Sequence, residues 1–422
     1  MTGTIIVGAG HAGVQAAASL REDGYSRPIT VLDAQDTTPY QRPPLSKEYL
    51  MREGEARALP LRPASFYERQ GIALRTGIAG TAVALDRVRR VVSLATGEEL
   101  PYEFVVIAVG ARNRPLSVEG IDRVSTYELR TIADAEALRA RFASMRTLAV
   151  VGGGFIGLEL AAAARTAAVE VTVIEATDRL MARVVTPVTS EFFADLHRGR
   201  GVRFRFNVTV EEVVSQESGD LSLRLDDGSW VSAETVAVGI GALPRTEIVE
   251  AAGLAVDGGI IVDGQLRTGD PRVFAVGDCA IVRRPGTRGL RLESVQNAVA
   301  HGRMVSRSIC GAKPVAEEVP WFWTTQFDAR LQIAGLLAGH DHVEVRGEPS
   351  DGTFVTLGFN EGRLLGGESV NSPRDHLAIR RLLGSGEAIG PHDLSELGVQ
   401  LGRCAPSPTE QATPQDHRQT AV

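Results

Sequence analysis

The sequence predicts an α/β fold with two Rossmann-like dinucleotide-binding domains, followed by a C-terminal α+β domain. A short β-branched strand leads into the glycine-rich turn at residues 8–13, and the same arrangement returns at residues 152–157. Strand-like runs at residues 331–337, 353–359 and 363–369 indicate an antiparallel sheet in the last quarter of the chain.

The first nucleotide site is predicted at the N-terminal turn. The strand of residues 4–7 is followed by Gly8-Ala9-Gly10-His11-Ala12-Gly13 and by a helical pattern over residues 14–22. In such a loop the first glycine makes the turn, the second lets the backbone approach a pyrophosphate, and the third packs helix on strand. The next strand ends at Asp33, a carboxylate that can accept from ribose hydroxyls.

The second copy of this pattern begins with the strand of residues 148–151. Its loop is Gly152-Gly153-Gly154-Phe155-Ile156-Gly157, and its acid after the following strand is Glu175. Two copies, each with strand, helix and acid in place, predict two bound dinucleotides. A carboxylate repels the 2′-phosphate of NADPH, so Glu175 favours NADH. Arg179 and Arg183 follow Glu175 closely in the sequence and could tolerate that phosphate.

Composition excludes several other classes of protein. A chain of 422 residues with 43% apolar and 23% charged residues is expected to form two or three globular domains. Its net charge of -7 argues against nucleic-acid binding and anionic-membrane binding. The three cysteines, 279, 310 and 404, form no CxxC pair, which indicates a reducing compartment and no metal site. No export signal or membrane span is expected, and the chain is expected in the cytoplasm.

Two later stretches resemble the two-dinucleotide flavoprotein reductases, whose fold is glutathione-reductase-like. Residues 104–112 resemble the strand and turn that leave the FAD domain, and residues 268–278 resemble the second FAD motif of that superfamily. The resemblance implies a discontinuous FAD domain at residues 1–111 and 241–319, interrupted by an NAD domain at 112–240. A C-terminal domain is expected at 320–402 and a disordered tail at 403–422.

Three further stretches narrow this resemblance. Residues 39–47, 293–298 and 320–323 are similar to NADH-dependent ferredoxin reductases of oxygenase systems, and the likeness runs from about residue 4 to residue 400. It implies electron transfer from NADH through FAD to a 2Fe-2S ferredoxin that serves a monooxygenase or a ring-hydroxylating dioxygenase. The cofactors carry this chemistry, while the protein aligns them and excludes water.

The resemblance also implies roles for particular residues. Lys47 is expected beside the reactive edge of the flavin, paired with Glu159, and Trp323 is expected to shield the flavin where the third domain closes over the FAD domain. Trp321 and Phe322 are expected to be packing around it. The expected FAD contacts are Gly8, Gly10, Ala12, Gly13, Asp33, Ala34, Arg42, Lys47, Ala82, Ala108, Gly110, Arg130, Gly277, Asp278, Val295 and Trp323. The expected NAD contacts are Gly152, Gly154, Phe155, Ile156, Gly157, Glu159, Glu175, Arg183 and Gly241.

Alternatives to some of these roles remain open. Asp278 could be a helix N-cap, Lys47 a surface lysine, and Arg130 an interdomain ion pair. An acidic ferredoxin needs a basic docking face, and the candidates are Arg303 and Arg307, with arginines 283, 284, 288 and 291 nearby. We expect a monomer, because this chemistry needs no residue from a second subunit.

Two rival functions share the predicted fold. Disulfide reductases and NADH peroxidases need a thiolate beside the flavin, usually on the helix after the first ribose acid, and residues 39–50 contain no cysteine. Cys279 next to Asp278 is better explained as a small buried apolar residue. An NADH-responsive sensor resembling apoptosis-inducing factor would use the same two nucleotide sites, so the sequence leaves this alternative open.

Overall fold

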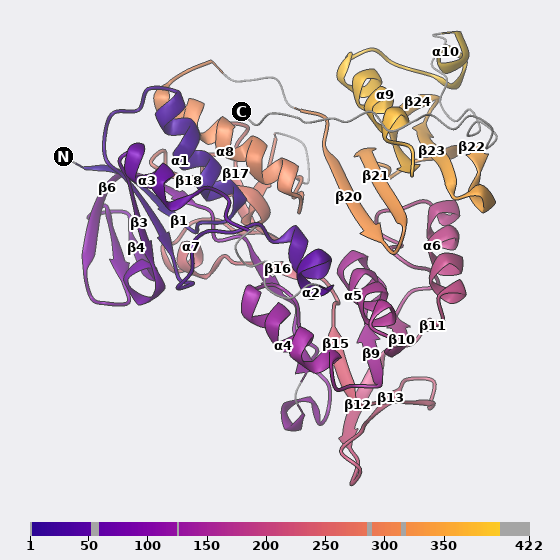
Figure 1. Cartoon of the computed structure of the whole chain (residues 1–422). Coiled ribbons are helices and arrows are strands. Elements are labelled where there is room, and N and C mark those ends of the chain that lie inside the picture. Colours follow the sequence, from indigo (N-terminus) through magenta and orange to yellow (C-terminus); the bar gives the residue numbers. More distant parts are fainter. Residues whose placement is uncertain (1, 52–58, 125, 285–288, 314–317, 397–422) are drawn as a thin grey trace, which may run out of the picture.

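The computed structural model describes residues 2–51, 59–124, 126–284, 289–313 and 318–396 (Figure 1). The predicted fold class is confirmed, since helices pack on two sheets built around parallel strands and an antiparallel sheet follows. The tail expected at residues 403–422 lies outside the described residues. Among the described helices, none has the length and apolar character needed to cross a membrane.

The N-terminal sheet has the strand order β3-β2-β1-β6-β5-β4, with β18 paired to β6. Strands β1, β2, β3, β6 and β18 run parallel, whereas β4 and β5 extend β6 as an antiparallel hairpin. Its elements and those packed around it are β1 (Gly3–Val7), α1 (His11–Glu22), β2 (Ile29–Asp33), α2 (Glu48–Met51), α3 (Ala64–Arg69), β3 (Ile72–Thr76), β4 (Ala82–Asp86), β5 (Val91–Leu94), β6 (Glu99–Ile107), α7 (Glu247–Ala251), β17 (Ile260–Val262), β18 (Val273–Ala275), β19 (Ala280–Val282) and α8 (Val295–Cys310).

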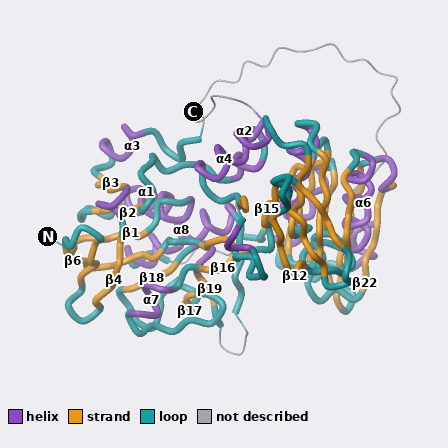
Figure 2. Tube along the Cα trace, turned by 90° about the horizontal axis from the view of Figure 1, so that it is seen from below, coloured by secondary structure: helices purple, strands orange, loops and turns teal. Residues whose placement is uncertain are grey.

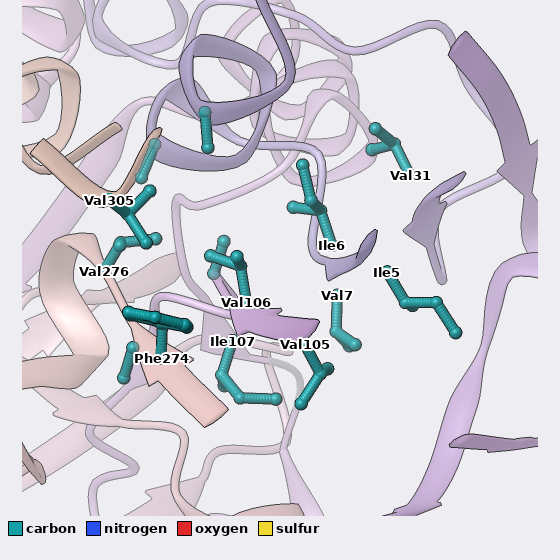
Figure 3. Close-up of a cluster of buried hydrophobic side chains, with 14 of the residues drawn as sticks. Ile5, Ile6, Val7, Val31, Val105, Val106, Ile107, Phe274, Val276 and Val305 are labelled. Carbon is teal, nitrogen blue, oxygen red and sulfur yellow. The ribbon is translucent and has the colours of Figure 1, made fainter. Parts of the chain in front are cut away.

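Burial on both faces explains why the parallel strands are almost continuously apolar. Side chains of β1, β6 and β18 meet in one cluster, in which Ile6, Val106 and Phe274 are at most 1% exposed (Figure 3). Each such side chain stabilises the fold by roughly 1.5–3 kcal/mol. Helices α1 and α8 cover this cluster and pack closely against each other. A Cβ at Gly302 of α8 would lie only 2.7 Å from the Cβ of Gln15 of α1.

The central sheet repeats this architecture, with the parallel order β11-β10-β9-β15-β8. A separate antiparallel meander, β12-β13-β14, packs beside it. The elements are β8 (Thr126–Tyr127), α4 (Ile132–Phe142), β9 (Thr147–Val151), α5 (Phe155–Thr166), β10 (Glu170–Glu175), α6 (Pro187–Gly199), β11 (Val202–Phe206), β12 (Val210–Ser215), β13 (Leu221–Leu225), β14 (Trp230–Ala233) and β15 (Thr235–Val238). The chain enters this unit through β7 (Ala111–Asn113) and leaves through β16 (Ala242–Pro244), which pair antiparallel.

The C-terminal sheet is antiparallel throughout, with the order β20-β21-β24-β23-β22. Its elements are β20 (Trp321–Gln326), β21 (Ala329–Gly335), β22 (His342–Glu348), β23 (Thr353–Asn360), β24 (Arg363–Val370), α9 (Pro373–Gly384) and α10 (Pro391–Glu396). The three strand-like runs predicted in this region correspond to β21, β23 and β24, with small shifts at their ends. Helix α9 covers one face through Ile379, which packs on Leu357.

The other face of the C-terminal sheet packs mainly on the central unit. Leu158 of α5 and Phe193 of α6 form one buried cluster with Leu331 and Phe354 of the sheet. Figure 1 places this sheet beside α5 and α6, and both views place it away from β1 (Figures 1 and 2). The third domain was expected to close over the FAD domain; its apolar contact with α5 and α6 of the central unit was not part of that prediction, and β20 also contacts α8.

A buried carboxylate joins the C-terminal sheet to α6. Glu368 on β24 is 0% exposed and accepts from the Thr186 N–H and hydroxyl, both at 2.7 Å. The hydroxyls of Thr189 and Thr356 donate to it as well. Because Thr186 caps α6, the carboxylate also lies at the end of the helix where its dipole stabilises negative charge. We call Glu368 with Thr186, Thr189 and Thr356 the Glu368 cluster.

The stability of the C-terminal domain is expected to depend on pH through His376. This side chain is 2% exposed, and neither ring nitrogen has a hydrogen-bond partner in the described part of the chain. Burial, together with Arg380 and Arg330, lowers the pKa of His376 to about 4. The unfolded chain therefore binds the proton more readily, and stability is lost as pH falls from about 6.5 towards 4.

We expect His376→Phe to reduce this loss, because phenylalanine keeps a ring beside Trp321 and does not titrate. Between pH 8 and pH 5 the variant should lose about 2 kcal/mol less free energy of unfolding than the wild type. Urea titrations at both pH values measure the difference. An identical loss in the two proteins would show that His376 does not carry this pH dependence.

Candidate active site

One cavity of about 1030 Å³ runs between the N-terminal and central sheets and reaches β20. It is lined by both glycine-rich loops, both predicted ribose acids, and residues of β20 and the start of α8. Ligand sites on doubly wound sheets lie at this edge, beyond the carboxyl ends of the parallel strands. The predicted FAD contacts line the cavity with the exception of Gly13, and the predicted NAD contacts line it with the exception of Gly157.

The first loop has the geometry of a pyrophosphate cradle. Gly8 has a φ of +105°, and a Cβ at Gly13 would lie 1.9 Å from the Gly8 carbonyl oxygen. At Gly10, by contrast, a Cβ would meet no described atom within 4 Å. Gly10 is the N-cap of α1, so the first N–H groups of that helix point towards the open space.

The second loop has the same geometry. Gly152 has a φ of +109°, a Cβ at Gly157 would lie 2.0 Å from the Gly152 carbonyl oxygen, and Gly154 again has no described atom within 4 Å. Gly157 therefore supports the loop from behind, which explains its absence from the lining. Phe155 and Ile156 begin α5 and line the cavity, and Ile156 is 43% exposed there.

The two predicted ribose acids are held in position by backbone N–H groups. Asp33 accepts from the N–H of Gln35 at 3.0 Å. Glu175 accepts from the N–H of Gly153 at 2.6 Å and from Thr177, so its carboxylate is fixed beside the second loop. Arg179 donates to the carbonyls of residues 182 and 185, which commits its guanidinium to the loop itself, whereas Arg183 lines the cavity.

The end of the cavity near α8 contains two half-buried charged groups, Asp278 and Arg130, and the hydrogen bonding of Arg130 is incomplete. Asp278 and Arg130 are 3.5 Å apart, and burial raises the pKa of the Asp278 carboxyl. Burial and the nearby Arg42 lower the pKa of Arg130, whose Nε has no partner among the described residues. Unsatisfied buried groups of this kind fit a polar ligand such as FAD. The ion pair predicted as the alternative for Arg130 is present, and it does not use all of the guanidinium.

Small residues and backbone complete this wall of the cavity. Gly277 has a φ of +72°, and a Cβ there would lie 3.1 Å from the Cβ of Ala12. For Ala12, Ala34 and Ala82 the sequence prediction expected only backbone contact and close packing, and these three residues line the cavity, as do Ala108, Gly110 and Val295. Asp278 is not a helix N-cap: it lies within a short 3-10 turn, and the N-cap of the nearby α8 is Ser294.

Lys47 and Glu159 form an ion pair between the two cradles. The distance from Nζ to Oε1 is 2.7 Å, and the side chains of Lys47 and Glu159 are 18% and 3% exposed. Glu159 also accepts from the hydroxyl of Thr324 at 2.6 Å and from the hydroxyl of Ser46. The predicted pairing is therefore present, and Lys47 is not a free surface lysine.

Sequence reasoning missed Ser46 and Thr324 as partners of Glu159. The sequence contained one signal for this site, the rarity of lysine: Lys47 and Lys313 are its only two lysines. In a chain whose other cationic side chains, except Lys313, are arginines, Lys47 places a compact ammonium group where an arginine would place a planar fork. No sequence pattern brings Thr324 next to Glu159, since the contact depends on how the C-terminal sheet packs.

The aromatic stretch on β20 divides as predicted between cavity and packing, with one addition. Trp323 lines the cavity, and its ring lies 5.3 Å from that of Trp321, which is not among the described lining residues. Phe322 points to the other side of the strand and packs on Phe155 with 4.6 Å between ring centroids. Phe322 also reaches the cavity, so it contributes to the lining as well as to packing.

The cavity lacks the thiol that the disulfide-reductase alternative requires. None of the described residues that line it is a cysteine. Cys279 is 0% exposed, its Sγ lies 3.5 Å and 3.3 Å from the carbonyls of Ile107 and Val276, and burial raises its pKa to about 11. A thiol in this environment stays protonated and is a poor nucleophile.

Those arginines predicted to dock a partner that the structure describes are engaged within the chain. Arg303 lies 3.3 Å from Glu318, and Arg307 lies 3.9 Å from Asp23 and donates to the carbonyl of Lys313. Arg283 and Arg291 pair with Asp257 and Glu293, whereas residue 288 lies outside the described residues. The structure thus shows a face of compensated charge, on which Arg303 is the more exposed of the two main candidates, at 55% against 34%.

Comparisons with known proteins agree with this geometry. Residues 2–302 match the pyridine nucleotide-disulphide oxidoreductase family model, and residues 321–405 match the reductase C-terminal model. Rhodocoxin reductase from Rhodococcus erythropolis is 42% identical over 398 residues, covering 94% of this chain and 93% of that protein.

Two solved structures are similar over nearly the whole chain. A ferredoxin reductase from Rhodopseudomonas palustris gives a TM-score of 0.89 at 41% identity, covering 93% of this chain and 96% of that one. The covalent putidaredoxin reductase–putidaredoxin complex gives a TM-score of 0.88 at 35% identity. The match covers 93% of this chain and 95% of that one.

Proposed function

The chain belongs to the pyridine nucleotide-disulphide oxidoreductase family, and we propose that it is a reductase carrying electrons from NADH through FAD to a 2Fe-2S ferredoxin. That ferredoxin serves a monooxygenase or a ring-hydroxylating dioxygenase. One observation carries the proposal: a single cavity contains two dinucleotide cradles, a Lys47–Glu159 pair between them, and no thiol among its described lining residues.

The residues of the first cradle would hold FAD. Its pyrophosphate fits the open space at Gly10, its adenosine ribose fits Asp33, and its ribityl chain fits the half-buried Asp278. Arg42 and Arg130 supply positive charge to the same end of the cavity. The small residues at positions 12, 34, 82 and 108, with Gly110, Gly277 and Val295, leave room for the cofactor.

The residues of the second cradle would hold NADH. Gly152, Gly154 and the start of α5 receive the pyrophosphate, and Glu175 receives the adenosine ribose. A fixed carboxylate at Glu175 disfavours a 2′-phosphate, and Arg179 is already committed to backbone carbonyls. The site therefore favours NADH over NADPH, with Ile156, Arg183 and Gly241 as further contacts.

When bound, FAD takes up a hydride and gives up electrons singly, which no protein side chain can do. The protein needs to align the two rings and exclude water. Lys47 supplies a positive charge held in place by Glu159, and Trp323 closes the cavity from β20. The positions of Lys47, Glu159 and Trp323 support the alignment role proposed for them, which requires no acid–base step.

The remaining parts of the proposal concern partner, assembly and compartment. The partner is an acidic 2Fe-2S ferredoxin that docks near Arg303 and Arg307. The enzyme acts as a monomer, since the site is built from one chain. Free Cys279 and Cys310 support a reducing compartment, for which we propose the cytoplasm.

Replacing Arg303 with glutamate tests whether a ferredoxin docks at this residue. We expect the wild type to reduce a 2Fe-2S ferredoxin rapidly with NADH, and Arg303→Glu to raise the KM for ferredoxin about tenfold or more. The variant leaves two acids side by side at Glu318, which repels an acidic partner. Steady-state rates with ferredoxin and with ferricyanide measure the effect, since the small acceptor does not need this face.

Three outcomes are informative. Equal loss with both acceptors would show that Arg303 supports the fold, and an unchanged KM for ferredoxin would remove it from the docking face. Slow ferredoxin reduction by the wild type, combined with NADH-induced dimerisation, would instead favour the sensor resembling apoptosis-inducing factor.

A further inference from the structure

Glu159 is the meeting point of three separate parts of the chain. It lies on α5 of the central unit, while Ser46 and Lys47 come from the N-terminal unit and Thr324 from the C-terminal sheet. The Lys47 ammonium at 2.7 Å and the Thr324 hydroxyl at 2.6 Å share one carboxylate oxygen, Oε1. The Ser46 hydroxyl donates to the other oxygen. Thr324 thus contacts the atom that fixes Lys47.

A second hydrogen-bonded pair lies behind Thr324. Gln326 and His197 are both 0% exposed, and the His197 Nε2 lies 2.9 Å from the Gln326 Oε1. Burial lowers the pKa of His197 to about 4, so the ring is neutral near pH 7 and its Nε2 carries the proton donated to that carbonyl. The Gln326 amide nitrogen is then turned towards Thr324 Oγ1, at 3.5 Å, and Met181 Sδ, at 3.8 Å.

This arrangement sets the direction of the Thr324 hydroxyl. A hydroxyl has one proton to donate and can accept at the same time. Because the Gln326 amide donates to Thr324 Oγ1, the threonine proton is directed to Glu159, which is a charge-assisted bond. The chain of contacts therefore runs from His197 through Gln326, Thr324 and Glu159 to Lys47.

Strand β20 explains why Thr324 can reach Glu159 while Trp323 lines the cavity. Successive side chains of a strand point to opposite faces, so adjacent residues serve the two functions. Register holds both in place, since Trp323 pairs with Gln332 and Thr324 with Leu331 of β21. Thr324 is 0% exposed, so water does not compete for its hydroxyl.

We propose that Thr324 is a positioning residue for Lys47, acting through Glu159, and that Gln326 and His197 set the direction of its hydroxyl. The C-terminal domain would then take part in hydride transfer as well as in closing the cavity. This inference rests on the proposed function for the reaction at Lys47, but the placement of the Lys47 ammonium is a property of the protein alone.

The kinetic test compares Thr324→Val, which removes the hydroxyl, with Thr324→Ser, which keeps it. We expect the rate of flavin reduction by NADH in single-turnover mixing to fall about tenfold in Thr324→Val and to recover in Thr324→Ser. The Kd for NADH should change less than twofold. Thr324→Ala provides a variant that cannot overpack the site. Equal rates in Thr324→Val and Thr324→Ser would overturn the proposal.

A double-mutant cycle separates positioning from general damage to the fold. If Thr324 acts through Lys47, Thr324→Val should have no further effect on the rate of flavin reduction in a Lys47→Met background. An undiminished tenfold loss in that background would show that Thr324 acts by another route and would overturn the proposal.

Labelling of the FAD-free protein tests the same inference without activity. The sequence has only two lysines, and Lys313 is exposed, so it is an internal reference for acetylation of Lys47 by acetic anhydride. We expect the Lys47-to-Lys313 labelling ratio to rise at least threefold in Thr324→Val and to return in Thr324→Ser, because a less fixed carboxylate holds the ammonium less well. An unchanged or lower ratio would overturn the inference. If NADH failed to reduce the flavin of the wild type, the proposed function would fail, while the labelling result would still decide this one.

Discussion

Replacing Gly154 with alanine should strongly weaken the use of NADH while the protein keeps its FAD. A methyl group at this position meets no described protein atom within 4 Å, so it obstructs only a ligand that approaches the loop. Because Gly154 is the N-cap of α5, the methyl group would occupy the space proposed for the NADH pyrophosphate. We expect the KM for NADH to rise about 100-fold, which corresponds to ~2.7 kcal/mol of binding free energy. Ferricyanide reduction measures the KM, and flavin absorbance measures the FAD content.

The matched control is Gly10→Ala in the first cradle, where a Cβ also meets no described atom within 4 Å. This variant should lose FAD and keep the fold, which is the reverse of the Gly154→Ala result. If both variants lost FAD, or if Gly154→Ala oxidised NADH normally, the assignment of the two cradles would be wrong.

Replacing Lys47 with methionine should slow flavin reduction by NADH about 100-fold, with FAD still bound. Loss of one preorganised electrostatic group from an active site commonly costs two to three orders of magnitude in rate. Lys47 is the cation paired with Glu159 in the cavity, and methionine fills similar volume without charge. Stopped-flow mixing of the FAD-loaded protein with NADH measures the rate.

The variant also leaves Glu159, 4% exposed, without its cation, which should destabilise the fold by about 3 kcal/mol. Adding Glu159→Gln removes the uncompensated charge, so the double variant should regain stability but not rate. A double variant that recovered the rate would show that Lys47 acts only through stability and has no role in alignment.

The sequence predicted best the features that depend on local backbone geometry. The positive φ of Gly8 and Gly152 and the close contacts behind Gly13 and Gly157 impose a spacing that can be recognised without a structure. The acids at positions 33 and 175 follow from the same strand-turn-helix unit. Buried parallel strands likewise account for the apolar runs that placed β1, β6, β9 and β18.

The features that escaped prediction depend on how units pack together. Nothing in the sequence around β20 indicates that Thr324 reaches Glu159, which lies 165 residues away. The main contact of the C-terminal sheet with α5 and α6 was also not anticipated. An apolar sheet face could pack on the N-terminal unit or on the central unit, and its sequence does not distinguish the two. Pairing of Arg303 with Glu318 was missed for a related reason, since a helical pattern shows which charges are exposed but not which acid comes near.

The Glu368 cluster has a practical consequence for exchanging parts between related reductases. Its carboxylate comes from β24, whereas two of its hydroxyl partners come from α6. A chimaera joined at Pro320 would pair the carboxylate of one parent with the α6 of the other. Unless the parent that supplies α6 has threonines at positions 186 and 189, the chimaera would bury the Glu368 carboxylate with too few hydrogen-bond donors. Residues 186 and 189 therefore form part of the C-terminal module, although they lie more than 130 positions before it in the sequence.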